Sequence, residues 1–164
     1  IATETIDNFQ NIYESKWLNM MRDKLGLFGE DKNDKKLIND LLIWMKNSKA
    51  DYTNTFCHLM NIKIKNSEIY KDNNFISWSN EWQKRLSGYN NSKEKSLDLM
   101  KASNPIIIPR NHKVEEALHA ANKGDLEKLN RLLSILSKPY ETNETIEEYQ
   151  LPSYNNEYQT FCGT

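Results

Sequence analysis

The sequence of 164 residues has few of the residues that interrupt regular structure or cross-link a chain. It contains five glycines, four prolines and two cysteines. So few glycines and prolines disfavour collagen-like chains, flexible linkers and all-β folds with many tight turns. Cys57 and Cys162 are too few for a disulfide scaffold or a zinc site made by cysteines alone, so we expect a cytoplasmic protein in a reducing compartment.

Charge of one sign and long apolar runs are also missing. Lys and Arg number 22 and Asp and Glu number 23, which leaves a net charge of −1. A chain this balanced has no overall field to hold nucleic acid or an anionic membrane, so we expect neither as a partner. No apolar run approaches the roughly 18 residues of a membrane-spanning helix. The chain begins with Ile1 rather than Met, and we expect it to be a fragment of a longer protein.

Apolar residues recur every three or four positions along most of the chain, as they do on one face of amphipathic helices. Over residues 5–25 this face contains Ile6, Phe9, Tyr13, Trp17, Met20 and Met21. The same spacing predicts further helices over residues 34–47, 51–60, 75–88, 92–102, 111–122 and 126–136. The sequence therefore predicts an all-α fold, a helical bundle of about six to seven helices.

Capping residues and prolines mark the ends of these helices. Asp34, Asp51 and Asp125 are predicted to cap the helices that follow them, and Gly26 is placed to end the first helix. The prolines of 103–110 break the chain, so a sub-boundary is possible there. We expect one helical domain over residues 1–138 and an extended, polar C-terminal tail over residues 139–164.

Residues arranged for catalysis are not evident. The sequence has no Gly-rich phosphate loop, no nucleophile elbow and no Ser-x-x-Lys motif. Cys57 and His58 are neighbours, and adjacent side chains on a helix point about 100° apart rather than toward one metal. His112 and His119 could share a helix face but have no nearby cysteine. We therefore expect no catalytic, cofactor-binding or metal-binding residue in this chain.

Residues 111–136 resemble a single ankyrin repeat. Alanines would let the first helix pack closely, Gly124 turns the chain, and Asp125 starts the second helix. A solenoid needs several stacked repeats, and only one is found. An independent helical protein-interaction module built on this hairpin remains the alternative function.

A more specific resemblance rests on motifs in a fixed order along the chain. The first group consists of Lys24-Leu25-Gly26-Leu27, the stretch from Ala50 to Phe56, Asn104-Pro105 and Pro109-Arg110-Asn111. The second consists of Ala117 to Ala121, Gly124-Asp125, Leu133 to Leu136, Pro139-Tyr140, Tyr149, Pro152 and Cys162-Gly163-Thr164. In this order and spacing, the motifs resemble the C-terminal region of the selenoprotein O family over about residues 9–164.

The resemblance implies a parent protein that is a kinase-like protein adenylyltransferase. Members of that family transfer AMP from ATP to protein hydroxyl groups and use ATP with a divalent metal, Mg or Mn. The kinase-like core would lie N-terminal to this chain and would be its partner, together with the protein substrates of the parent. None of the family's phosphate- or metal-handling residues has a match here, so the fragment itself is expected to be non-catalytic.

Cys162 is the one position that matches a candidate functional site of the family. The resemblance implies a redox role, because a selenocysteine or cysteine occupies this place in some members. The family's second cysteine would fall on position 159, which is Gln159 here. Any disulfide would therefore have to reach Cys57, the missing core or another molecule, and a bystander thiol is the alternative.

Overall fold

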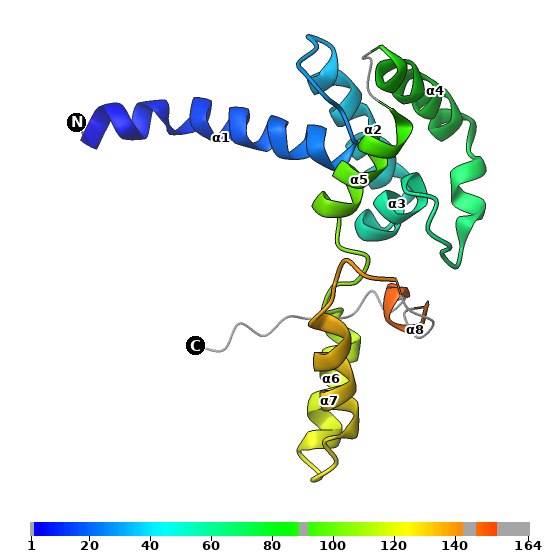
Figure 1. The fold of residues 1–164 in the computed structure, drawn as a ribbon. Helices are drawn as coiled ribbons and strands as arrows, with labels where there is room; N and C mark the ends of the chain where they lie inside the picture. Colours follow the sequence, from blue (N-terminus) through cyan, green and yellow to red (C-terminus); the bar gives the residue numbers. More distant parts are fainter. Residues whose placement is uncertain (1, 89–91, 143–146, 154–164) are drawn as a thin grey trace. The chain divides into compact units, whose positions relative to one another are not determined.

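The computed structural model describes residues 2–88, 92–142 and 147–153 (Figure 1). These residues form eight α-helices and one 3₁₀-helix, η1, and no strand occurs among them. The elements are α1 (Ala2–Lys24), α2 (Asp34–Ser48), α3 (Tyr52–Leu59), η1 (Ser67–Lys71), α4 (Asn73–Ser87), α5 (Lys93–Ser103), α6 (Asn111–Ala121), α7 (Glu127–Leu136) and α8 (Glu147–Gln150). The predicted all-α class is confirmed, and the predicted helices differ from the observed ones mainly at their ends.

The chain divides into two compact units, residues 1–105 and residues 106–164. In the first unit, α2 packs against both α1 and α4, and α5 packs against α1 (Figure 1). The core between these helices is apolar and contains Met21, Leu25, Ile38, Leu41, Phe56, Trp78 and Trp82, all of them buried. The helices of this unit therefore close around the C-terminal part of α1.

Gly26 ends α1 as the sequence predicts and also allows α5 to approach. Its φ of 68° lies in the left-handed region, which side chains other than glycine adopt at a cost. A Cβ at this position would lie 2.7 Å from the carbonyl oxygen of Ser96 on α5. Beside it, the Lys24 Nζ donates to the Ser103 carbonyl, while the Asn104 amide donates to the Lys24 carbonyl. These bonds fix α5 across the end of α1.

The two predicted caps of the first unit have different outcomes. Asp51 is the N-cap of α3 and its carboxylate accepts from the Asn54 amide at 2.9 Å, as predicted. The prediction for Asp34 is wrong, because the N-cap position of α2 belongs to Asn33 and Asp34 is the first helical residue. The Asp34 carboxylate is turned inward, where it is completely buried and binds two arginines.

The second unit is built on a hairpin of α6 and α7, which pack side by side. The prediction that Asp125 caps α7 is wrong in position, because the N-cap of α7 is Leu126. The Asp125 carboxylate lies one residue earlier and accepts a hydrogen bond from the Glu127 amide. Below the hairpin, the Pro139 carbonyl accepts from the amides of Ile106 and Ile107. Among the described residues of this unit, those that are buried are Ile106, Ile107, Ala117, Leu132, Ile135, Tyr149 and Gln150.

Most of the predicted tail over residues 139–164 lies outside the described residues, and its described part contains one short helix. Glu147–Gln150 form α8, and both Tyr149 and Gln150 are buried. The polar, non-periodic sequence hides this helix because one turn is too short to show a period. Among the described residues, no helix is both long enough and apolar enough to cross a membrane.

Candidate functional site

The first half of α1 carries an exposed apolar face. Ile6, Phe9 and Tyr13 are 73%, 65% and 58% exposed, and Met20 on the same side is 44% exposed. Phe9 and Tyr13 stack on each other with ring centroids 6.3 Å apart. In a folded helix such a stripe normally lies against a core or a partner, since exposing it to water is unfavourable. We call Ile6, Phe9, Tyr13 and Met20 the α1 face.

A buried ionic cluster joins α1, α2 and α4. The carboxylate of Asp34 accepts from Arg22 Nε at 2.7 Å and from Arg85 Nε at 2.7 Å. Burial disfavours its charge, but the bonds from Arg85, the Asp31 amide and Arg22 outweigh this effect and lower the pKa of Asp34. Arg85 also donates to the Phe28 carbonyl at 3.1 Å. Because both carboxylate oxygens have partners, this cluster holds helices together and offers no free group for acid–base chemistry.

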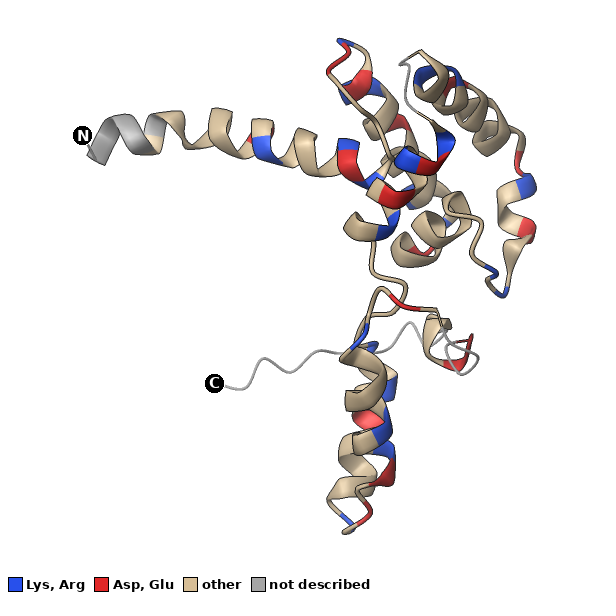
Figure 2. Ribbon diagram, viewed as in Figure 1, with Lys and Arg blue, Asp and Glu red and all other residues tan. Residues whose placement is uncertain are grey.

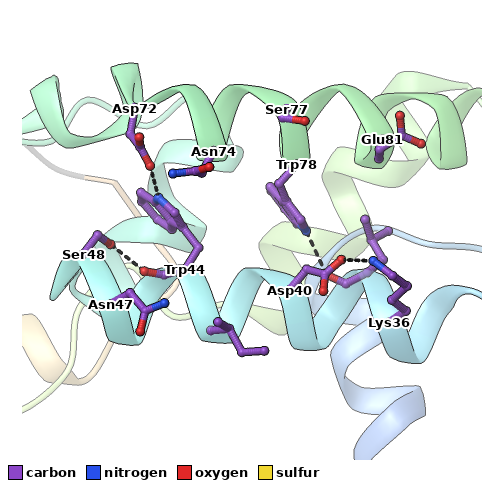
Figure 3. A pocket seen from close by; sticks show the side chains of 12 residues that line it. Lys36, Asp40, Trp44, Asn47, Ser48, Asp72, Asn74, Ser77, Trp78 and Glu81 are labelled. Carbon is purple, nitrogen blue, oxygen red and sulfur yellow. Dashed lines mark hydrogen bonds and ion pairs between the residues drawn. The ribbon is translucent and has the colours of Figure 1, made fainter.

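A groove of about 800 Å³ runs between α2 and α4 (Figure 3). Its apolar lining includes Trp44, Trp78 and the exposed Ile43. Trp44 donates its indole N–H to the Asp72 carboxylate at 2.6 Å, and Trp78 donates to the Leu37 carbonyl at 2.8 Å. The remaining lining residues are polar or charged: Lys36, Asp40, Asn47, Ser48, Asn74, Ser77 and Glu81. We call this feature the α2–α4 groove.

Cys57 and His58 lie in α3 but in different surroundings. Cys57 is completely buried in the core, whereas the half-buried His58 ring stacks on Tyr70 with centroids 4.0 Å apart and planes 7° apart. Burial lowers the pKa of His58, because it disfavours the charged imidazolium. It also raises the pKa of Tyr70 to about 12. His58 and Tyr70 therefore belong to an aromatic cluster, in which Phe75 also packs on Tyr70 with ring centroids 5.1 Å apart.

His112 and His119 both lie in α6, as predicted, with His112 half-buried and His119 exposed. Burial, followed by the charge of Lys113, lowers the pKa of His112. In the part of the chain that the structure describes, no three His, Cys, Asp or Glu side chains are grouped to hold a metal ion. Cys162 lies outside the described residues.

The hairpin of the second unit presents an apolar surface of its own. Leu118, Leu126 and Leu133 are 47%, 53% and 56% exposed. On the same unit, Lys113 bonds to Glu148 at 2.8 Å, and its ammonium lies 5.6 Å from the ring centre of Tyr149. Figure 2 shows basic and acidic residues interleaved on α6 and α7 rather than separated by sign.

Sequence reasoning missed both the ionic cluster and the α2–α4 groove. Asp34 and Arg85 are 51 positions apart, and no local pattern connects them. The one sequence signal for the groove was the presence of Trp44 and Trp78 on two amphipathic stretches. These stretches predict two helices, but the sequence does not show that the two helices pack against each other. The exposed residues of the α1 face all belong to the stripe that the spacing did identify.

Comparison with known proteins identifies the family of the chain, which the geometry alone does not. Residues 2–137 match the family described as protein adenylyltransferase SelO. The chain belongs to the SelO family. This confirms the resemblance carried by the ordered motifs.

Individual SelO relatives match the whole chain. A protein nucleotidyltransferase YdiU from Pelagibacter ubique is 57% identical over 166 residues, covering 100% of this chain and 34% of the relative. Proteins of the same name from Nitrosococcus oceani and Bacillus cytotoxicus are each 46% identical, with the same coverage. The chain therefore spans about a third of the length of the curated SelO relatives that it matches.

Proposed function

We propose that this chain is the non-catalytic helical C-terminal region of a protein adenylyltransferase, which packs on a kinase-like core and regulates it. The parent would transfer AMP from ATP to hydroxyl groups of protein substrates, with Mg or Mn as the divalent metal. The match to the SelO family over residues 2–137 carries this proposal. The relatives' name, nucleotidyltransferase, and their threefold greater length support it.

The α1 face supports the packing part of the proposal. The side chains of Ile6, Phe9 and Tyr13 form one apolar stripe and are more than half exposed. Burying such side chains stabilises a protein by about 1.5–3 kcal/mol each. A kinase-like core is the partner that the family relationship offers for this stripe. The same proposal places the protein in the cytoplasm, with neither nucleic acid nor a membrane as a partner.

Transfer of labelled AMP tests the catalytic assignment. With ATP labelled on the α-phosphate and either Mg or Mn, a longer protein that includes the kinase-like core should label a protein substrate. The 164-residue chain alone should label none, because its described residues bring together no three His, Cys, Asp or Glu side chains that could hold the divalent metal. Labelling by the chain alone would contradict the proposal.

Hydrogen exchange tests the packing. The amides of residues 6–20 should exchange slowly in the longer protein and faster in the isolated chain, because an uncovered half-helix frays. Replacing both Phe9 and Tyr13 by serine should restore fast exchange in the longer protein. Asn11→Ser, on the opposite side of α1, is the matched control and should leave the protection unchanged. Equal exchange in the longer protein and the isolated chain would contradict packing.

An independent interaction module remains the second candidate, and the exposed hairpin leucines favour it. In that case Leu118, Leu126 and Leu133 would form a binding surface that works in the isolated chain. Serine at these three positions would then abolish partner binding while AMP transfer by the longer protein stayed unchanged. If the chain serves the adenylyltransferase instead, the same changes should alter AMP transfer.

The redox role of Cys162 stays a prediction. Mass spectrometry of the longer protein under oxidising and reducing conditions would detect a disulfide and identify its second cysteine. An unmodified thiol under both conditions would remove the redox role, since a reactive thiolate is oxidised more readily than an inert thiol.

A further inference from the structure

The α2–α4 groove has the dimensions of a binding site for one helix. The lining residues of α2 extend from Lys36 to Ser48, which is about 18 Å at the rise of an α-helix. Figure 3 shows α4 above and α2 below, with Asp72 opposite Ser48 at one end and Glu81 near Lys36 at the other. A groove between two helices is a common receptor for an amphipathic helix of about three turns.

The walls of the groove are fixed before anything binds. The Trp44 indole is held by Asp72 at 2.6 Å, and the Trp78 indole is held by the Leu37 carbonyl at 2.8 Å. Trp44 also packs on Phe75, with ring centroids 4.6 Å apart. Since these side chains are already ordered, a ligand would lose little free energy in ordering them. Ile43 adds an apolar contact point that is 57% exposed.

Carboxylates lie at both ends of the groove. Asp72 is at the Trp44 end, and Asp40 and Glu81 are at the Trp78 end (Figure 3). Lys36 is the one basic residue in the lining, and it pairs with Asp40 at 2.6 Å. Glu81 pairs with Lys84, which does not line the groove. Exposed pairs within one helix contribute little and exchange readily, so these carboxylates can accept a second cation.

Asp72 is anionic at neutral pH. The hydrogen bond from the Trp44 indole, together with bonds at the start of α4, lowers the pKa of its carboxyl group. The groove lining therefore combines three carboxylates and one lysine with apolar side chains, of which Ile43 is 57% exposed and Trp44 and Trp78 are each 7% exposed. A basic segment matches this excess of carboxylates better than an acidic one.

We propose that the α2–α4 groove binds a short helical segment of another protein that carries lysine or arginine at both ends and apolar side chains between them. The apolar side chains lie against Ile43 and the two tryptophans, and the terminal cations lie near Asp72, Asp40 and Glu81. The inference depends on the groove alone and does not require that the chain belong to an adenylyltransferase.

A designed peptide tests this proposal. The probe is a fluorescently labelled helix of about 12 residues, three turns long, with two lysines at each end and alanine and leucine between. A second probe has glutamates in place of the lysines. By fluorescence anisotropy, the full chain should bind the lysine probe at least about tenfold more tightly. Added salt should weaken this binding. Equal affinity for the two probes would overturn the proposal.

Paired variants locate the binding. Ile43→Ser, and separately Asp40→Asn with Glu81→Gln, should each weaken binding of the lysine probe by about threefold or more. All three side chains are at the surface, so the chain should remain folded, and circular dichroism checks this. Ile76→Ser and Asp98→Asn are matched exposed changes outside the groove and should leave affinity unchanged.

Two outcomes would overturn the proposal at this stage. One is equal weakening by the groove variants and the matched controls, which would mean that the probe binds elsewhere. The other is concentration-dependent self-association of the chain that Ile43→Ser abolishes, since the occupant would then be a second copy of this chain.

Discussion

The two compact units of the chain bury their residues in different ways. In residues 1–105, three tryptophans are buried and each indole N–H has a hydrogen-bond acceptor. A completely buried aspartate also binds two arginines there. Among the described residues of 106–164, by contrast, the core is mainly aliphatic, and Tyr149 of α8 is the one buried tyrosine.

The difference suggests different dependence on surroundings. Buried polar groups are costly unless every partner is in place, so they favour one arrangement of helices over others. A two-helix hairpin with a small core buries little surface, and three of its leucines are about half exposed. The buried polar contacts therefore fix the arrangement of the helices in the first unit, whereas the hairpin depends on a small aliphatic core. Both units have exposed apolar side chains that a partner could cover, on the α1 face and on the hairpin.

The largest effect should come from Asp34 in the first unit. Asp34→Ala leaves Arg22 and Arg85 as buried or half-buried charges without their carboxylate, and should lower the free energy of unfolding by about 3–5 kcal/mol. Urea unfolding followed by tryptophan fluorescence measures this loss. Asp98→Ala, at an exposed site on α5, should change stability by less than about 0.5 kcal/mol. If both variants are equally stable, the ionic cluster does not contribute to the stability of the first unit, and the contrast between the two units would be wrong on this point.

The same carboxylate gives the first unit a dependence on acid. Its pKa is lowered in the folded state, so its contribution is fully present above the unfolded value of about 4. That contribution is lost as the pH falls through the folded pKa. The wild-type chain should therefore lose stability more steeply than Asp34→Asn below about pH 4.

Adjacent leucines test the core of the second unit. Leu132 is 5% exposed and Leu133 is 56% exposed, so they form a pair that differs mainly in burial. Leu132→Ala should lower the free energy of unfolding of the hairpin by about 2–3 kcal/mol, and Leu133→Ala by less than about 0.5 kcal/mol. Hydrogen exchange of the α6 and α7 amides measures the stability of the hairpin separately from that of the first unit. Similar costs would mean that the hairpin has no distinct core.

A structural feature could be predicted from the sequence when the residues that determine it are close together along the chain. The periodic stretches predicted helices well, because the pattern that defines a helix face lies within the helix itself. Gly26 and Asp51 were identified for the same reason, since a cap acts on its immediate neighbours. Asp34 also resembled a cap, and only the approach of Arg85, 51 residues away, turns it into a buried ion.

The candidate functional surfaces show the same difference between features set by neighbouring residues and features set by distant ones. The stripe over residues 5–25 was evident in the sequence, but its exposed half became visible only when the other helices closed around the C-terminal part. The groove depends on the pairing of α2 with α4, which no local pattern specifies. Tyr149 is another case, because its burial depends on contacts with Lys113 and Arg131 from the hairpin.

A smaller effect should separate two tryptophans within the first unit. Trp82 donates to the carbonyl of Leu25, which follows the end of α1, whereas Trp78 donates to Leu37 inside α2. Helical carbonyls already have a backbone donor, so losing the Trp78 bond leaves no orphaned group. Trp82→Phe should cost about 1–3 kcal/mol in urea unfolding, and Trp78→Phe less. The reverse order would contradict the importance that we assign to buried polar partners.

The smallest effect should come from His58, the titrating group of the aromatic cluster with Tyr70. Its folded pKa is lowered by burial, so the unfolded chain binds the proton more tightly. Stability should be fully present above the unfolded pKa of about 6.5 and should fall with the pH until the lower folded pKa is reached. His58→Gln should reduce this slope in a series of thermal midpoints, whereas His119→Gln, at an exposed site on α6, should keep it. Burial also lowers the pKa of the half-buried His112 of the second unit, so changing His58 and His112 together should reduce the slope further. A slope that is unchanged in His58→Gln would assign the pH dependence to another group and would reverse the contrast between the units.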